Sequence, residues 1–125
     1  MVYFIGAGPG DVDLITVKGR EILKKADVII YTGSLVSSAH MDFCKDGAEI
    51  HNSASMNLEQ VIKIIERAEN ENKLTVRLHT GDPSIYGAIK EQMDELDKIH
   101  IKYDIIPGVS SFTAAAAAIK KEFTL

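Results

Sequence analysis

Short apolar runs alternate with helical apolar stripes along the whole chain. Runs of this kind, bounded by glycine, proline or polar residues, are typical of buried strands. They predict strands at residues 2–5, 27–31, 48–51, 74–78 and 103–106. Between the strands, apolar positions recur at helical spacing and predict helices at residues 16–26, 57–68, 84–97 and 110–121. The chain therefore reads as a regular alternation of strand and helix.

Capping residues support three of the predicted helices. Thr16 precedes the apolar positions of the first helix and is a suitable N-cap. Asn57 precedes the clearest stripe, and Gln60 follows three residues later, close to the pattern of a capping box. In the last helix, either Ser110 or Ser111 serves as the cap. The alanine run at 114–118 would allow close packing against the sheet or another surface.

The order of the elements predicts the fold class. Strands that alternate with helices form βαβ units, whose crossovers are right-handed and place helices on both faces of a parallel sheet. We therefore expect an α/β domain with a five-stranded, mainly parallel sheet. Its 125 residues are an ordinary size for one domain.

Composition and charge argue against two classes of binding partner, membranes and nucleic acids. With 46% hydrophobic and 26% charged residues, the composition is that of a globular protein. No apolar run approaches the ~20 residues of a membrane span, so we expect no membrane partner. The net charge of −4 disfavours nonspecific nucleic-acid binding, and we expect no nucleic-acid partner. Cys44 is the only cysteine, which excludes a disulfide framework and indicates a cytoplasmic protein.

The residues at the two ends of the chain lead to two further predictions. Residues 1–6 lack the basic region and cleavage site of a signal peptide and read as a first strand. Residues 122–125 leave the last helix and begin an extended segment without a polar tail. We expect the chain to be cut from a longer protein.

Three glycine-bearing loops follow predicted strands. They lie at residues 6–11, 80–83 and 107–111, with the sequences GAGPGD, TGDP and PGVSS. Ligands of open parallel sheets bind outside the carboxyl ends of the strands. We expect the three loops to converge on one cleft at that edge.

The first loop does not fit a dinucleotide site. Its glycines follow the spacing G-x-G-x-G, where the dinucleotide motif requires G-x-G-x-x-G. Pro9 removes a backbone donor and Asp11 would repel a pyrophosphate. The second strand ends in Tyr31 and Thr32 without the acid that binds a ribose. No Gly-Lys-Ser/Thr follows the glycines, which excludes a P-loop.

The edge instead offers close backbone approach, the carboxylates of Asp11 and Asp82, and the hydroxyls of Ser110 and Ser111. This set suits a ligand with hydroxyls and a positive centre and without phosphates. S-adenosylmethionine has these groups, and sugars or amino acids would fit as well. The purely structural interpretations stay open: the glycines shape turns, and Asp82 and the serines cap helices. The histidines show no metal-ligand spacing, and we expect no metal site.

Three ordered motifs resemble those of the tetrapyrrole methylase family. Residues 3–16 (YFIGAGPGDVDLIT), 77–87 (RLHTGDPSIYG) and 107–118 (PGVSSFTAAAAA) are similar to its first, third and fourth motifs. Within the family, residues 32–36 (TGSLV), the His-Thr before Gly81 and the segment VSSF resemble the precorrin-4 or cobalt-precorrin-4 C-11 methyltransferases of cobalamin synthesis. Relatives that act on uroporphyrinogen, another precorrin, rRNA or diphthamide share the scaffold, and a non-catalytic ligand-binding module is the alternative from another class.

The resemblance implies an N-terminal domain spanning residues 1–125, with strand order 3-2-4-1-5, and a second α/β domain absent from this chain. It implies S-adenosylmethionine as methyl donor, a tetrapyrrole substrate and a homodimer of the full-length protein. Carried over by position, the cofactor contacts are Pro9, Thr80, Gly81, Asp82, Ile85, Ser110 and Ser111. The loop containing Gly8, Gly10 and Asp11 would face the macrocycle. The resemblance assigns no catalytic residue, because the sulfonium itself makes the methyl carbon electrophilic.

Overall fold

A central parallel sheet organises the molecule. The computed structural model describes residues 1–33 and 36–124. Its strands are β1 (Val2–Gly6), β2 (Val28–Tyr31), β3 (Glu49–Asn52), β4 (Thr75–His79) and β5 (Tyr103–Ile106). Its α-helices are α1 (Val17–Lys25), α2 (Leu58–Asn70), α3 (Ile89–Lys98) and α4 (Ser111–Ala118), and three short 3-10 helices are η1 (Val12–Leu14), η2 (Ser38–Phe43) and η3 (Ser53–Ser55).

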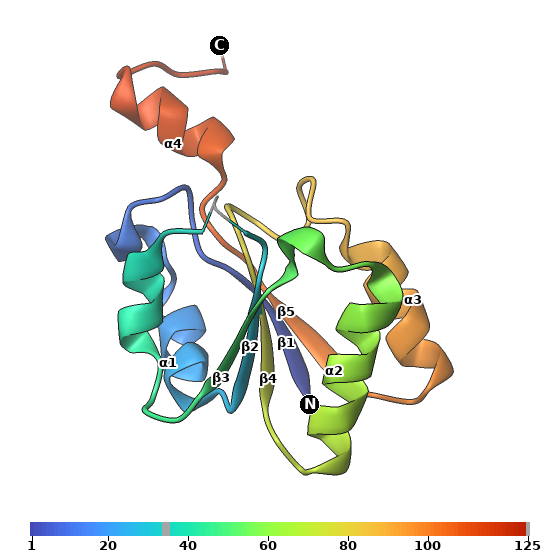
Figure 1. Cartoon of the computed structure of the whole chain (residues 1–125). Coiled ribbons are helices and arrows are strands. Elements are labelled where there is room, and N and C mark those ends of the chain that lie inside the picture. Colours follow the sequence, from blue (N-terminus) through green and yellow to red (C-terminus); the bar gives the residue numbers. More distant parts are fainter. Residues whose placement is uncertain (34–35, 125) are drawn as a thin grey trace.

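The five strands lie in the order β3-β2-β4-β1-β5, and every pairing is parallel. This confirms the predicted sheet and its strand order. The register brings Gly6, the last residue of β1, beside His79, the last residue of β4. The loops that follow β1, β4 and β5 therefore leave the same edge of the sheet, at the top of Figure 1.

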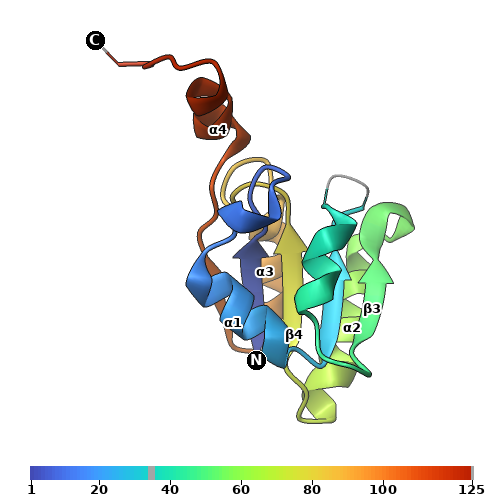
Figure 2. The same cartoon turned by 90° about the vertical axis from the view of Figure 1, so that its left-hand side faces the viewer.

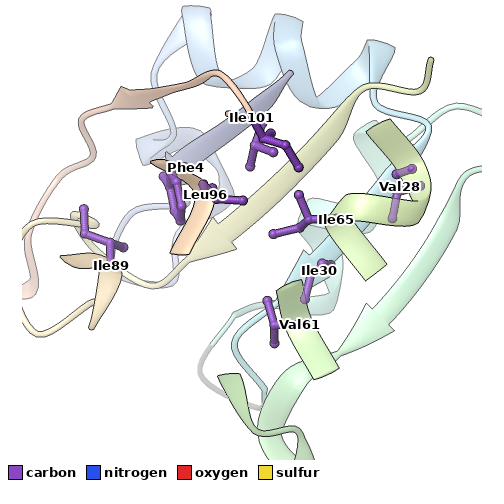
Figure 3. Close-up of a cluster of buried hydrophobic side chains, with 10 residues drawn as sticks. Phe4, Val28, Ile30, Val61, Ile65, Ile89, Leu96 and Ile101 are labelled. Carbon is purple, nitrogen blue, oxygen red and sulfur yellow. The ribbon is translucent and has the colours of Figure 1, made fainter. Parts of the chain in front are cut away.

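Helices cover both faces, as predicted. In Figures 1 and 2, α1 lies on one face and α2 and α3 lie on the other. The two faces carry separate apolar cores, because successive strand residues point to opposite sides. Figure 3 shows the core beneath α2 and α3, in which Phe4 and Ile30 of the sheet meet Ile65 and Leu96 of the helices. The other core packs Ile5, Ile29 and Leu78 against α1 and η2.

The helix N-caps predicted from the sequence are present in the structure. Thr16 accepts a hydrogen bond from the backbone N–H of Gly19 at the start of α1. Asn57 and Gln60 form a reciprocal capping box, each side chain accepting from the other's backbone N–H at 2.9 Å. Ser110 is the N-cap of α4 and accepts from the N–H of Phe112. These local bonds satisfy donors that no helical carbonyl can reach.

The prediction that a helix begins at residue 84 is wrong. The helix begins at Ile89, and the preceding residues form a turn. Asp82 accepts from the N–H of Ser84 and holds this turn. Tyr86 and Ala88 adopt left-handed backbone conformations, with φ of 58° and 52°, which interrupt a right-handed helix.

The alanine-rich helix α4 does not cover the sheet. It projects beyond the carboxyl edge and carries the described end of the chain away from the body (Figures 1 and 2). Among its residues only Ala116 is buried. The packing of the alanine run against the sheet, one of the two uses expected for it, is therefore not present in the described residues. No helix in the described part of the chain is both long enough and apolar enough to span a bilayer.

Candidate functional site

Three glycines, one from each loop, bring the loops into backbone contact. Gly6 ends β1, Gly81 follows β4 and Gly108 follows β5. A Cβ atom on Gly6 would lie 2.4 Å from the carbonyl oxygen of Gly81 and 2.6 Å from Cα of Gly108. A Cβ atom on Gly108 would lie 2.1 Å from the same oxygen. Because atoms this close collide, the approach requires glycine at both positions.

Hydrogen bonds connect the loops. Gly8 and Gly81 form an antiparallel bridge, in which Gly81 N–H donates to Gly8 O at 2.8 Å and Gly8 N–H donates to Gly81 O at 3.3 Å. The carboxylate of Asp82 accepts from Gly108 N–H at 2.9 Å and from Ser84 N–H at 2.8 Å. Asp82 thus joins the β4 loop to the β5 loop and also stabilises its own turn.

The loops therefore converge, as the sequence predicts. A Cβ atom on Gly81 would lie 3.8 Å from Cα of Ser110 and from N of Ser111, so the third and fourth motifs are in contact. Gly8 joins them through the backbone bridge to Gly81, and Pro9 follows Gly8 directly. The cofactor residues predicted for the three loops lie at one edge of the sheet.

Other predicted residues lie farther out on the same loops. A Cβ atom on Gly10 would have no atom within 4 Å, and Asp11 is exposed. The Asp11 carboxylate accepts from the N–H of Asp13 and caps η1. Ile85 is 51% exposed. Residues 34 and 35 of the TGSLV segment lie outside the described residues.

Two buried polar atoms at the end of β4 have no hydrogen-bond partner in the described structure. They are Oγ1 of Thr80 and Nε2 of His79. Burial, together with the neighbouring Arg77 guanidinium, lowers the pKa of His79 to about 3, so its ring is neutral at physiological pH. A buried hydroxyl without a partner is costly, which is the condition expected where a ligand group or another protein surface completes the bond.

Sequence reasoning missed the shape of residues 83–88. A Cβ atom on Gly87 would lie 2.0 Å from the carbonyl oxygen of Pro83, so the segment folds back tightly on itself. Tyr86 is fully exposed at the tip of this fold, beside the exposed Ile85. The combination of Pro83 and Gly87 was an available signal for a turn, but the helical spacing of apolar residues obscured it.

The three loops form a junction of backbone groups, hydroxyls and glycines, and one carboxylate bridges two of them. The junction can hold an uncharged, hydroxyl-bearing group close to the backbone. Among the described residues, no group of three or more His, Cys, Asp or Glu side chains could hold a metal ion. Fold and loops together define an α/β domain in which three glycine loops meet at the carboxyl edge of a parallel sheet, the edge where ligands of open parallel sheets bind.

Comparison with known proteins identifies the family. The model of the Tetrapyrrole (Corrin/Porphyrin) Methylases matches residues 1–124, and the chain belongs to this family. A cobalt-precorrin-4 C(11)-methyltransferase from Methanocaldococcus jannaschii is 59% identical over 124 residues, which are 99% of this chain and 48% of that protein.

Solved structures agree with this assignment. An X-ray structure of a cobalt precorrin-4 methyltransferase matches with a TM-score of 0.97 and 49% identity, over 99% of this chain and 52% of the other. A uroporphyrin-III C-methyltransferase from Thermus thermophilus, complexed with S-adenosyl homocysteine, matches with a TM-score of 0.78 and 29% identity, over 92% and 47%. The chain spans about half the length of the relatives that it matches.

Proposed function

We propose that the chain is the N-terminal, cofactor-facing domain of an S-adenosylmethionine-dependent methyltransferase. The substrate we propose is precorrin-4 or cobalt-precorrin-4, methylated at C-11 in cobalamin biosynthesis. Support comes from family membership and from the names of relatives at high identity. Further support comes from the solved relative complexed with S-adenosyl homocysteine, the demethylated form of the donor.

The observation that carries the proposal is the buried Thr80 hydroxyl. It has no hydrogen-bond partner in the described structure, and it lies where the three loops meet. Gly81 beside it packs against the next loop, since a Cβ atom on Gly81 would lie 3.8 Å from Cα of Ser110 and from N of Ser111. Because the hydroxyl is covered in the described structure, a nucleoside reaches it only when a covering loop shifts. The hydrogen bond formed then would supply the missing partner, and in this sense the residues present fit S-adenosylmethionine.

The residues of the loops have positional roles in this proposal. The cofactor contacts are Pro9, Thr80, Gly81, Asp82, Ile85, Ser110 and Ser111, and Gly8, Gly10 and Asp11 face the macrocycle. The sulfonium supplies an electrophilic methyl group, and the electron-rich tetrapyrrole is the nucleophile. The domain contributes by holding the donor in one orientation and by excluding water, which lowers the entropic cost of the transfer. Asp82 acts through the two backbone N–H groups from which it accepts hydrogen bonds, and these bonds keep the loop junction in shape.

The partners follow from the same proposal. We propose a tetrapyrrole as the small-molecule substrate, a homodimer of the longer protein and a cytoplasmic location. A second α/β domain would complete the trough around donor and macrocycle.

The proposal is tested by a methyl-transfer assay with labelled S-adenosylmethionine. The 125-residue chain and the longer parent protein are incubated with a precorrin-4-type substrate. We expect the parent to transfer methyl groups and the chain alone to be inactive, because one wall of a trough cannot orient both reactants. Transfer by the chain alone at the parental rate would show that the active site is placed wrongly. Transfer to uroporphyrinogen III alone would change the proposed substrate.

Thr80→Val, made in the parent protein, tests the cofactor site itself. The isosteric change removes the hydroxyl that lacks a partner, so we expect equal or higher thermal stability and about fivefold weaker binding of S-adenosyl homocysteine in calorimetry. Thr124→Val removes an exposed hydroxyl and is the control. Unchanged affinity in Thr80→Val would mean that the hydroxyl does not meet the cofactor.

A further inference from the structure

A buried arginine in the sheet has no role in the loop junction described above. Arg77 is in the middle of β4, on the face covered by α2 and α3, and is only 6% exposed. Its Nε donates to Oε1 of Gln92 at 3.0 Å, and its Nη1 donates to the carbonyl oxygen of Ile30 at 3.2 Å. These are two of the five N–H groups of a guanidinium.

No carboxylate pairs with this guanidinium in the described part of the chain. Burial lowers the pKa of Arg77 to about 10, so the group still carries its charge at physiological pH. Buried charges are normally paired with an opposite charge, because water no longer solvates them. The free N–H groups of Arg77 are therefore available to an anion.

A cavity of about 170 Å³ adjoins Arg77. It lies between the starts of α2 and α3, with Ser53 and Asn57 on one side and Ala88 and Gln92 on the other. Figure 1 places both helix starts at the carboxyl edge of the sheet, the edge from which the three loops leave. Arg77 lines this cavity, and among the described residues its Nη2 donates no hydrogen bond.

The walls of the cavity hold the guanidinium in place. Gln92 accepts from Arg77 through its oxygen and donates through its Nε2 to the carbonyl oxygen of Ala88 at 3.2 Å. Ala88 has a left-handed backbone and ends the tight segment that begins at Pro83. The guanidinium is thus oriented before any ligand arrives, which reduces the entropic cost of binding.

We propose that Arg77 and this cavity form a binding site for a single carboxylate group. The volume is too small for a macrocycle or a nucleoside but accepts the carboxylate end of a short chain. A guanidinium with free N–H groups in a plane matches the two oxygens of a carboxylate. Of the residues that line the cavity, only Glu91 is acidic, and it is exposed.

This inference rests on the proposed function for the source of the carboxylate. Both proposed ligands carry one: the acid side chains of the tetrapyrrole and the amino-acid end of S-adenosylmethionine. Propionate represents the first source and L-methionine the second. Glu91 distinguishes them, because its charge repels a simple carboxylate and attracts the ammonium group of an amino acid.

The test follows the Nε–H resonance of Arg77 by NMR in the 125-residue chain at constant ionic strength. We expect propionate to shift the resonance saturably, with a dissociation constant on the order of 10 mM. Glu91→Gln should tighten propionate binding about threefold, and Glu66→Gln, which removes an exposed charge of α2 outside the cavity, should leave it unchanged. Gln92→Glu places a carboxylate beside the guanidinium and should abolish the response, while circular dichroism reports whether that variant is folded.

Each outcome has a defined meaning. Tighter binding of propionate than of L-methionine identifies a substrate acid group, and the reverse order, with weakening in Glu91→Gln, identifies the amino-acid end of the donor. A resonance that neither probe shifts, or a propionate response that survives in folded Gln92→Glu, would overturn the proposal. These outcomes are independent of the methyl-transfer assay, so a failure here leaves the proposed function intact.

Discussion

At the scale of single residues, glycines determine whether the three loops can meet. Gly6 and Gly108 lie where the carbonyl oxygen of Gly81 fills the space that a side chain would take. Gly8 and Gly81 have positive φ angles of 85° and 64°, which other residues rarely adopt. The close approach of the loops thus depends on positions without side chains as well as on the hydroxyls and the carboxylate around them.

We expect Gly108→Ala to destabilise the chain by about 3 kcal/mol, because the new methyl group meets backbone atoms that cannot rotate away. The measurement is the free energy of unfolding in urea. Gly47→Ala is the matched control, since no atom lies within 4 Å of its Cβ position and only its φ of 81° opposes the change. That control should cost about 1 kcal/mol. Equal losses in both variants would show that the loops do not require close contact at Gly108.

His79 makes the stability of the chain depend on pH. Its pKa in the folded chain, about 3, is below the ordinary value of 6.5. As the pH falls below about 6.5, the unfolded chain binds a proton that the folded chain does not. The free energy of unfolding therefore decreases, by about 1.4 kcal/mol per pH unit from this group, until the pH approaches the folded pKa.

His79→Asn should remove this component of the pH dependence. We expect the free energy of unfolding of the variant to fall less steeply than that of the wild type between about pH 6 and pH 4, measured by urea titration at each pH. The same exchange at the exposed His100 controls for the loss of an imidazole. An equally steep curve in His79→Asn would contradict the burial of a neutral histidine.

At the scale of elements, the connection between β4 and α3 differs most from the pattern in the sequence. Apolar spacing continues through residues 84–88, yet the backbone forms a tight turn with left-handed residues at Tyr86 and Ala88. The side chain of Tyr86 is fully exposed, so burial of its ring does not offset the cost of the left-handed backbone. Strain of this kind is typical of functional segments, and this segment connects Asp82 of the loop junction to Ala88 of the Arg77 cavity.

Tyr86→Gly should therefore stabilise the chain, by about 1 kcal/mol, because glycine adopts the left-handed conformation without strain. Ile85→Gly is the matched control: it is the neighbouring exposed residue, and its backbone is not left-handed. That change should destabilise by up to about 1 kcal/mol, through chain entropy. Thermal unfolding of both variants gives the comparison, and a loss of stability in Tyr86→Gly would show that the turn is not strained.

At the scale of the whole molecule, α4 and the segment after it form an exposed apolar extension. Phe112, Ile119 and Phe123 are 61%, 64% and 54% exposed, and the rings of Phe112 and Phe123 stack with centroids 4.2 Å apart. The extension stands on the same edge as the three loops (Figure 2). Exposed apolar clusters of this kind are typical of surfaces that another protein surface covers.

We expect the isolated chain to associate with itself through this extension. In sedimentation equilibrium, its average mass should rise with concentration, and a Phe112→Ser, Phe123→Ser double variant should remain closer to the monomer. Val17→Ser is the control, because Val17 is 70% exposed and belongs to α1, which is not part of the extension. A wild-type mass that does not change with concentration would rule out this association.

The amino-acid sequence by itself determined the elements and the class of fold. Strand runs, the caps at Thr16 and Asn57, and the alternation of strand and helix are local patterns, and local hydrogen bonds and side-chain spacing decide them. The sequence also identified the three loops, because the carboxyl ends of parallel strands share one edge. The residues expected there, from Gly8 to Ser111, are in the loops that converge.

Only the tertiary structure decided what those residues contact. Asp82 accepts a hydrogen bond from Gly108, which is 26 residues away in the chain, and the packing of three separate loops leaves the Thr80 hydroxyl without a partner among the described residues. The start of α3 at Ile89 depends on the turn that Asp82 holds, which overrides the helical spacing before it. Arg77 is one basic residue among 14 in the sequence, and only packing from both sides makes it a buried cation beside a cavity. Contacts between distant segments depend on how the elements pack together, which no local pattern encodes.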